Sequence, residues 1–317
     1  MNDELKVFTG NAHPELAKAI TKSLHIPLGK CEVTQFSNEN TFVRVLENVR
    51  ERDVFIVQPI SSPVNSHIME LLIMIDAMKR ASARRITAVM PYYAYGRSDK
   101  KDQPRVPITA RLIADLLTVA GANRVLTVDL HKAQIQGFFN IPVDELTAFH
   151  LLTDYFKKNK KEAIKNMVVV AADFGITKQA RDIAAWMKKP LAIMEKRRIG
   201  NKDKTELLNV IGDVDGKNAL IVDEEIDTAG SLVSVVDALV ARGANEIYAC
   251  STHAVFSGDA IEKIANCKVK KVVVTNSVPI PPGKISDKIE IIPIAPLLGE
   301  AIKRIHTGQS VGAMFEK

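Results

Sequence analysis

Short runs of β-branched and other apolar residues alternate along the chain with longer amphipathic stretches. Each short run is almost continuously apolar, as expected for a parallel strand that is buried on both faces. The runs predicted as strands are Val54–Val57, Ile86–Met90, Val125–Val128, Val168–Ala171, Ala219–Val222, Ile247–Cys250 and Val272–Thr275. The stretches predicted as helices are Ile68–Lys79, Ile108–Val119, Phe149–Lys158, Thr177–Met187, Leu232–Ala241 and Leu297–His306. This alternation predicts an α/β fold with doubly wound parallel sheets.

One part of the pattern occurs twice. A helix, a Gly-Ala-Asn turn, a strand and a histidine follow one another in each copy, and glycine suits the left-handed conformation that often ends a helix. The corresponding residues are Asp115, Leu117, Gly121, Ala122, Asn123 and His131 in the first copy and Asp237, Leu239, Gly243, Ala244, Asn245 and His253 in the second. Equal spacing favours a duplicated domain, with coincidence between two βαβ units as the alternative.

The repeat predicts two similar domains with a boundary near Asp144–His150. We assign residues 1–146 to the first domain and residues 147–317 to the second, and the last helix could pack on either of them. The length of 317 residues agrees with this division, because single cores stop growing at roughly 250–300 residues.

Composition narrows the class of ligand. The net charge is +6, from 43 basic and 37 acidic residues, and the basic residues are scattered among acidic ones. A nucleic-acid surface would be more clustered and interleaved with aromatic residues, so we expect no nucleic-acid partner and consider a small anionic ligand compatible. The three cysteines lack metal-ligand spacing, and neither a signal peptide nor a membrane-spanning run is recognisable. We therefore expect a cytoplasmic protein with no membrane partner.

The clearest local signal is a strand, an acidic cluster, a turn of small residues and a helix in direct succession. Backbone N–H groups at the start of such a helix can bind a phosphate, and glycine permits close approach. Carboxylates at the carboxyl end of a strand can accept hydrogen bonds from sugar hydroxyls. The residues concerned are Asp223, Glu224, Asp227, Thr228, Ala229, Gly230 and Ser231. They predict a sugar-phosphate site, although a capped helix with an acidic first turn is the simpler alternative.

Three further segments have weaker signals. His131 follows a strand and Asp129, so it is a candidate metal ligand or phosphate donor, although a lone histidine is more often structural. Asp173 precedes a glycine-containing turn and could hold Mg²⁺ or simply cap the turn. Arg97 follows a buried strand and could contact phosphate or stack on a base, or be an ordinary surface residue.

The chain resembles the ribose-phosphate diphosphokinase family. The segment Asp223–Ser231 is similar to the phosphoribosyl-binding signature that this family shares with type I phosphoribosyltransferases. Three other segments resemble the diphosphokinases in particular, namely Asp129–Phe139, Pro63–Ile75 and Pro91–Asp99. The resemblance extends over essentially the whole chain, to His306 and Gln309–Val311. It implies two phosphoribosyltransferase-type domains and transfer of the diphosphoryl group of Mg·ATP to ribose 5-phosphate.

The resemblance also implies roles for individual residues. Lys196 and Arg198 match the catalytic lysine and arginine of a flexible loop, where the basic run alone would suggest a solvated surface loop. His131 matches a histidine that contacts the metal–ATP complex, and Asp173 lies in the loop around the diphosphate and its metal. The implied ATP-binding residues of the first domain are Phe36, Asn38, Asn40, Arg97, Ser98, Asp99 and His131. A homo-oligomer, dimer-based or hexameric, is implied because a neighbouring subunit helps to build the adenine site in this family.

Some positions depart from the family pattern. Asn38 and Asn40 replace acidic residues, and Ser98 replaces a common glutamine, which affects base selectivity. Ile176 stands where a second glycine is common, and Glu224 replaces an aspartate. We expect activity to be retained. The alternatives are a non-catalytic regulatory homologue, or a phosphoribosyltransferase that consumes the same product.

Overall fold

The computed structural model describes residues 5–198, 206–280 and 285–315, with the side chains of 196–198 and 206–208 outside the description. The chain forms two compact units, of which unit 1 holds residues 1–147, 277–279 and 293–317. Unit 2 holds residues 148–276 and 280–292. The chain therefore passes from unit 1 to unit 2 after Thr147, and the last helix belongs to unit 1. The sequence left the last helix free to pack on either domain, and in the structure its apolar residues are buried in unit 1.

Unit 1 contains a parallel five-stranded sheet with the order β1-β4-β5-β6-β7. Its strands are β1 (Leu5–Thr9), β4 (Asp53–Val57), β5 (Arg85–Met90), β6 (Arg124–Val128) and β7 (Val143–Leu146). Every residue of β4 is buried, which explains its uninterrupted apolar run. A separate antiparallel hairpin consists of β2 (Cys31–Gln35) and β3 (Thr41–Val45), and it packs on α2 (Val64–Arg80).

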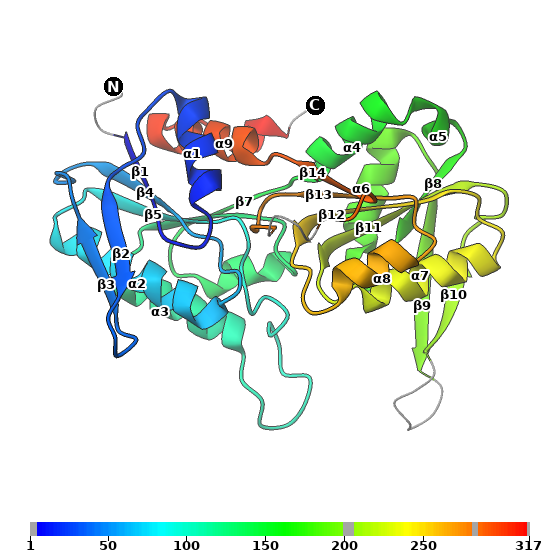
Figure 1. Cartoon of the computed structure of the whole chain (residues 1–317), viewed down its shortest axis with the longest axis horizontal. Helices are drawn as coiled ribbons and strands as arrows, with labels where there is room; N and C mark the ends of the chain where they lie inside the picture. The colour runs from blue at the N-terminus through cyan, green and yellow to red at the C-terminus, as the bar shows by residue number, and fades with distance from the viewer. Residues whose placement is uncertain (1–4, 199–205, 281–284, 316–317) are drawn as a thin grey trace. The chain divides into compact units, whose positions relative to one another are not determined.

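Helices cover both faces of the unit 1 sheet (Figure 1). One face carries α1 (Pro14–Leu24) and α9 (Ala295–Thr307), and the other carries α2 and α3 (Thr109–Ala120). The helices α1 and α9 lie side by side although they come from opposite ends of the chain. At this contact a Cβ on Gly299 would lie 2.3 Å from the Ser23 hydroxyl oxygen, so a side chain there would require Ser23 to move. Two short 3₁₀ helices are η1 (Ala133–Phe138) and η3 (Gly312–Met314).

Unit 2 contains a seven-stranded sheet with the order β10-β9-β8-β11-β12-β13-β14, in which only β10 pairs antiparallel. Figure 1 shows α4 and α6 on one face and α7 and α8 on the other. The strands are β8 (Met167–Ala171), β9 (Leu191–Arg198), β10 (Glu206–Ile211), β11 (Asn218–Ile226), β12 (Ile247–Ala254), β13 (Lys271–Thr275) and β14 (Ile289–Ile292). The helices are α4 (Phe149–Asn159), α5 (Lys161–Lys165), η2 (Phe174–Ile176), α6 (Thr177–Met187), α7 (Gly230–Ala241) and α8 (Ala260–Asn266).

The repeated sequence pattern corresponds to a repeated structure. In unit 1 it forms α3, a turn and β6, and in unit 2 it forms α7, a turn and β12. Gly121 and Gly243 both have positive φ angles, 120° and 80°. The asparagine of each copy donates its backbone N–H to a backbone carbonyl at 2.8 Å. The acceptor of Asn123 is Ile86 in β5, and the acceptor of Asn245 is Lys217, just before β11. The prediction of two similar parallel α/β domains is thus confirmed.

All seven predicted strands are present, but two are longer than expected. Strand β11 continues through Asp223 to Ile226, and β12 continues through His253 to Ala254. Cys31, Cys250 and Cys267 are free thiols. Among the described residues, no helix combines the length and apolar character needed to cross a bilayer.

Candidate functional site

The carboxyl ends of β8 and β11 bring two predicted site residues to one edge of the unit 2 sheet. These strands are parallel neighbours, and Ala171 is paired with Val222. Asp223 directly follows Val222, and Asp173 lies two residues after Ala171, so both lie near this edge. This is where ligands bind in open parallel sheets, because the strand carboxyl ends and helix amino ends converge there.

The environment of Asp223 is unusually negative. Burial raises the pKa of Asp223 well above its ordinary range, and the charges of Glu224 and Asp173 raise it further. One Asp223 oxygen also accepts a hydrogen bond from the backbone N–H of Glu224 at 3.0 Å, which opposes the increase only in part. A cluster of carboxylates that repel one another in this way is suited to a ligand that brings hydrogen-bond donors or positive charge.

The loop Asp227–Ser231 has the geometry expected of a phosphate site. Ala229 lies in the left-handed region with φ 58°, and α7 starts at Gly230. Within the described part of the chain, no side chain caps the first turn of α7. A Cβ placed on Gly230 would have only the Thr228 hydroxyl within 4 Å, at 3.8 Å. The first backbone N–H groups of α7 lack intrahelical partners and can bind an anion.

The segment after β12 holds this loop in place. Backbone N–H groups of Phe256 and Ser257 donate to the carbonyls of Ile226 and Asp227, each at 3.1 Å. The ammonium of Lys263, on α8, lies 3.4 Å from the carbonyl oxygen of Thr228. It also pairs with Asp259 at 2.7 Å. Lys263 was not recognised in the sequence, because it lies far along the chain from the loop and has no motif of its own.

Asp173 caps the short helix η2. Its Oδ1 accepts hydrogen bonds from the backbone N–H groups of Gly175 at 2.6 Å and Ile176 at 3.3 Å. The sequence allowed Asp173 to be either a metal ligand or a turn cap, and the structure shows that it caps the turn. The charge of the same carboxylate also raises the pKa of Asp223. Ile176 has φ −98°, which any residue adopts, so this turn does not require a second glycine.

Lys196 and Arg198 belong to a strand, which corrects the expectation of a loop at these positions. Strand β9 continues to Arg198 and pairs antiparallel with β10, with Lys196 opposite Leu208 and Arg198 opposite Glu206. Pairing with β10 extends the regular backbone beyond the apolar run that the sequence displays. Their side chains lie outside the description, as do residues 199–205 of the expected loop.

In unit 1, the loops that carry His131 and Arg97 touch each other. A Cβ placed on Gly96 would lie 3.3 Å from the Cβ of His131. His131 follows Asp129, which is buried and has φ 38°. The Arg97 loop is anchored at Ser98, whose backbone N–H donates to Tyr95 at 2.9 Å and whose carbonyl accepts from Ala110 at 3.2 Å. Arg97, Ser98 and His131 are therefore brought together, with Asp99 next in the chain.

Phe36, Asn38 and Asn40 lie in the turn of the β2–β3 hairpin. The backbone N–H of Phe36 donates to Asn40 at 2.9 Å, and the Asn38 side chain accepts from the Asn40 N–H at 3.2 Å. The ring of Phe36 is 56% exposed and tilted against Phe42 at 5.5 Å. An exposed aromatic ring on a turn of fixed geometry can stack on a planar ligand.

The described residues contain no group of three or more His, Cys, Asp or Glu side chains arranged to hold a metal ion. The carboxylates of Asp173 and Asp223 nevertheless have the oxygen chemistry that Mg²⁺ prefers, and Mg²⁺ commonly uses one or two carboxylates together with substrate phosphates. The negative charge of Asp173 raises the pKa of Asp223, and a nearby cation would oppose this repulsion. The residues present therefore fit a magnesium ion that binds with its substrate.

Comparison with known proteins gives the same family over both units. The model for the N-terminal domain of ribose phosphate pyrophosphokinase matches residues 5–121, and the phosphoribosyl synthetase-associated domain matches residues 198–316. The ribose-phosphate pyrophosphokinase of Corynebacterium ammoniagenes is 49% identical over 315 residues, 99% of this chain and 98% of that protein. That of Caldanaerobacter subterraneus subsp. tengcongensis is 51% identical over 313 residues, with coverage of 99% and 98%.

A solved structure agrees with these relatives. The crystal structure of phosphoribosylpyrophosphate synthetase from Mycobacterium smegmatis is 41% identical, with a TM-score of 0.90, and the match covers 96% of this chain and 99% of that one. The protein is therefore an enzyme of the two-domain phosphoribosyltransferase-type α/β class. Within this class, the chain belongs to the ribose-phosphate pyrophosphokinase family, also called the diphosphokinases. The family resemblance predicted from the sequence is confirmed.

Proposed function

We propose that the chain transfers the diphosphoryl group of Mg·ATP to the anomeric hydroxyl of ribose 5-phosphate, giving phosphoribosyl diphosphate and AMP. Full-length similarity to ribose-phosphate pyrophosphokinases supports the reaction class. The observation that carries the proposal is the combination, at one edge of unit 2, of an open helix start at Gly230 with the carboxylates of Asp173 and Asp223. This combination suits a sugar phosphate accompanied by a cation.

Ribose 5-phosphate is bound by unit 2. The loop formed by Asp227, Thr228, Ala229, Gly230 and Ser231 donates backbone and hydroxyl hydrogen bonds to the 5-phosphate. Asp223 and Glu224 accept hydrogen bonds from the ribose hydroxyls. This fixes the orientation of the sugar, so that its anomeric hydroxyl is presented for attack. The longer side chain of Glu224 still carries a carboxylate beside Asp223, which is why we expect binding to be retained.

ATP is bound by residues of unit 1. Phe36 stacks on the base, Asn38 and Asn40 contribute amide hydrogen bonds, and Arg97, Ser98 and Asp99 contact the nucleotide. His131 is the unit 1 residue proposed to contact the metal and the phosphates, and Asp173 is the residue proposed for the metal in unit 2. When bound, Mg²⁺ would supply positive charge that offsets the negative charge of the phosphates.

The transfer itself is a direct displacement. A bond forms between the anomeric oxygen and the β-phosphorus, the bond from the β-phosphorus to the α,β-bridging oxygen breaks, and the hydroxyl proton is released. Lys196 and Arg198 stabilise the negative charge that develops on the transferred group. No covalent nucleophile is required, so the residues act by positioning and by charge neutralisation.

Membership of this family also supports a proposal for the enzyme's location and assembly. We propose a cytoplasmic enzyme of nucleotide biosynthesis that forms a homo-oligomer, dimer-based or hexameric. Size-exclusion chromatography with light scattering tests the assembly. We expect a mass that corresponds to two or more chains of 34.9 kDa. A monomer that is fully active would contradict it.

The reaction is tested by AMP formation from ATP with and without ribose 5-phosphate in magnesium buffer. We expect AMP only in the presence of the sugar, and its loss in Lys196→Ala but not in Lys158→Ala, which removes a lysine of α4. Folded protein that forms no sugar-dependent AMP would favour the non-catalytic homologue. AMP that requires a nucleobase would indicate a different reaction.

A further inference from the structure

Strand β7 holds the His131 loop through one carboxylate. Glu145 lies on β7 opposite Thr127 of β6. Its Oε1 accepts the backbone N–H of Leu130 at 2.9 Å, and its Oε2 accepts the side-chain amide of Gln136. Leu130 and Gln136 are on either side of His131 in the sequence, so a single side chain fixes the start of the loop and its 3₁₀ helix.

The backbone supports the same connection. The N–H of Asp129 donates to the Leu146 carbonyl at 2.9 Å, which continues the β6–β7 pairing to the point where the loop departs. Asp129 then takes its left-handed conformation, with φ 38°. The chain direction changes here, and a left-handed residue other than glycine persists only when its surroundings determine it. The bond from Leu130 to Glu145 is the next contact along the chain.

Glu145 occupies a position that is costly for a carboxylate. Burial raises the pKa of Glu145, and the hydrogen bonds from Leu130 and Gln136 oppose this increase. A buried carboxylate that lost these donors would lack compensation, and the N–H of Leu130 would lose its acceptor. The Glu145 carboxylate therefore needs both donors, and the backbone N–H of Leu130 needs this carboxylate as its acceptor.

Movement of this loop would reach the other nucleotide residues. The position for a Cβ on Gly96 is only 3.3 Å from the Cβ of His131 and 3.8 Å from the side chain of Ile135. The segment that carries Arg97 therefore runs close beside His131, with no room for a larger residue at Gly96 unless a neighbour moves. Positioning of both side chains depends on the placement of one loop.

We infer that Glu145 is a positioning residue for ATP binding, which acts by fixing the backbone on both sides of His131. It does not touch the reacting atoms. The inference rests on the proposed function, in which His131 contacts the metal–ATP complex. Removing a group that holds a metal-site residue in its orientation typically lowers metal affinity or activity by about 10- to 100-fold.

The test compares Glu145→Ala with Asp144→Ala. Asp144 precedes Glu145 on β7, so its side chain points to the opposite face, where it pairs with Arg124 at 2.5 Å. Both changes remove a carboxylate from one strand, but only Glu145→Ala releases the loop. We expect the KM for ATP to rise about tenfold in Glu145→Ala, with the KM for ribose 5-phosphate within about twofold. Asp144→Ala should leave both constants near those of the wild type.

Two further variants make the result specific. In Glu145→Gln, an amide oxygen still accepts from Leu130, and Gln136 can rotate its amide to pair with the new NH₂ group, so near-normal kinetics are expected. Gln136→Ala removes only the second contact and should raise the KM for ATP in the same direction; it carries the test if Glu145→Ala does not fold. Equal kinetic constants in Glu145→Ala and Asp144→Ala would overturn the inference.

Hydrogen exchange separates this inference from the proposed function. Peptides covering residues 129–138 should exchange faster in Glu145→Ala than in the wild type or Asp144→Ala, whether or not the enzyme is active. If wild-type protein forms no AMP, the proposed function fails, and exchange alone decides whether Glu145 fixes the loop. Unchanged exchange in Glu145→Ala would overturn the inference even in an active enzyme.

Discussion

His306 and Asp53 are 253 positions apart in the chain, and the Nδ1 of the histidine lies 2.9 Å from Oδ2 of the aspartate. Asp53, the first residue of β4, is fully buried, and Arg85 on β5 donates two hydrogen bonds to its carboxylate. Arg85 also donates to the carbonyl of Ile305 at 3.1 Å. The hydrogen bond to Asp53 raises the pKa of Arg85. This network joins the C-terminal helix α9 to the sheet of unit 1.

We expect Asp53→Ala to destabilise unit 1 strongly. Removing one partner of a buried charged pair typically costs about 3–5 kcal/mol, because the other charge loses its compensation. His306→Ala leaves the Asp53–Arg85 pair intact and should cost about 1–3 kcal/mol. Urea unfolding measures both values. The control is Asp76→Ala, which breaks the exposed Asp76–Arg80 pair and should cost less than about 1 kcal/mol. Equal losses in all three variants would contradict this account of the network.

Asp223→Asn should make the protein more stable near neutral pH while reducing its activity. The pKa of Asp223 is raised above its ordinary value of 3.8 in the folded protein, so the folded state binds more protons than the unfolded state above that value. Ionisation of Asp223 therefore lowers the free energy of unfolding as the pH rises from 3.8 towards the raised pKa. The asparagine variant lacks this loss.

Thermal unfolding of both proteins over a pH series, with and without Mg²⁺, measures this effect. The wild type should lose Tm relative to Asp223→Asn as the pH rises. Mg²⁺ with ribose 5-phosphate should restore more stability to the wild type than to the variant. A variant that is less stable than the wild type at every pH would show that the negative cluster does not destabilise the protein.

Lys263→Gln should weaken ribose 5-phosphate binding while leaving ATP binding almost unchanged. The loop Asp227–Ser231 contains no cationic residue of its own, and the Lys263 ammonium lies against the Thr228 carbonyl. We expect the KM for ribose 5-phosphate to rise several-fold, on the order of the 0.5–1.5 kcal/mol that a typical hydrogen bond contributes. Lys263→Arg should restore part of the affinity.

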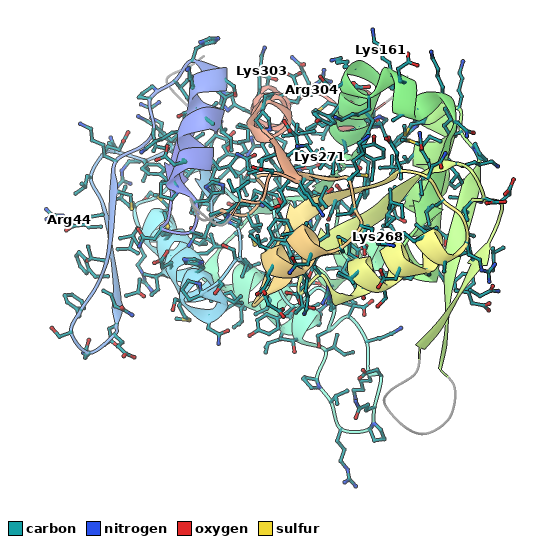
Figure 2. All side chains as sticks on the ribbon, turned by 45° about the vertical axis from the view of Figure 1, so that its right-hand side comes forward. Arg44, Lys161, Lys268, Lys271, Lys303 and Arg304 are labelled. Atoms are coloured by element: carbon teal, nitrogen blue, oxygen red, sulfur yellow. The ribbon has the colours of Figure 1, made fainter. Side chains whose placement is uncertain are left out.

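The matched control for this charge is Lys268→Gln. Lys268 is an exposed lysine beyond the end of α8, labelled in Figure 2. It carries the same charge in unit 2, and its side chain is exposed. A similar rise in both glutamine variants would show a general electrostatic effect instead of a local one.

Substitutions of Ala229 test whether the conformation of the loop Asp227–Ser231 is needed for binding. Its left-handed backbone is accessible to alanine at some cost, whereas a β-branched side chain is strained there by roughly 1–2 kcal/mol or more. Ala229→Val should therefore lower both the Tm and the affinity for ribose 5-phosphate. Ala229→Gly should preserve both, because glycine adopts this conformation readily. Normal sugar-phosphate affinity in the valine variant would mean that the loop conformation is not needed for binding.

The strands and helices that the sequence predicts best are those with a continuous apolar run or a regular amphipathic pattern. The observed helix Thr177–Met187 has the predicted limits, and β4, β5, β6, β8 and β13 differ by at most one residue. The hairpin β2–β3 was not predicted, because its two strands alternate between half-buried and exposed residues and contain no continuous buried apolar run. Strand β11 continues beyond its apolar part because pairing with β12 does not require apolar side chains.

The candidate site was predicted to the extent that it depends on neighbouring residues in the chain. The loop Asp227–Ser231 and the edge position of Asp223 follow from the order of strand, turn and helix. Contacts between distant segments did not follow. Lys263 beside Thr228, Glu145 beside Leu130 and His306 beside Asp53 each depend on the tertiary arrangement. The position of the last helix in unit 1 was left open for the same reason.

The lysines and arginines near the C-terminus illustrate this limit. Lys303 and Arg304 lie together on α9 in Figure 2, but their surroundings differ. Arg304 pairs with Glu300 at 2.7 Å and donates to the Ser310 carbonyl at 2.9 Å, whereas Lys303 is exposed. The helical spacing predicts the first contact, while the second depends on how the chain turns back after Gly308.

In the proposed reaction, the β-phosphorus of ATP is attacked and the diphosphoryl group is transferred intact. Phosphorus-31 NMR of a reaction containing the wild-type enzyme, Mg²⁺, ATP and ribose 5-phosphate tests it most directly. We expect AMP and a sugar product that carries a diphosphate at its anomeric oxygen, formed in equal amounts. Formation of ADP with a sugar bearing a single added phosphate would place the attack at the γ-phosphorus and contradict the proposed reaction.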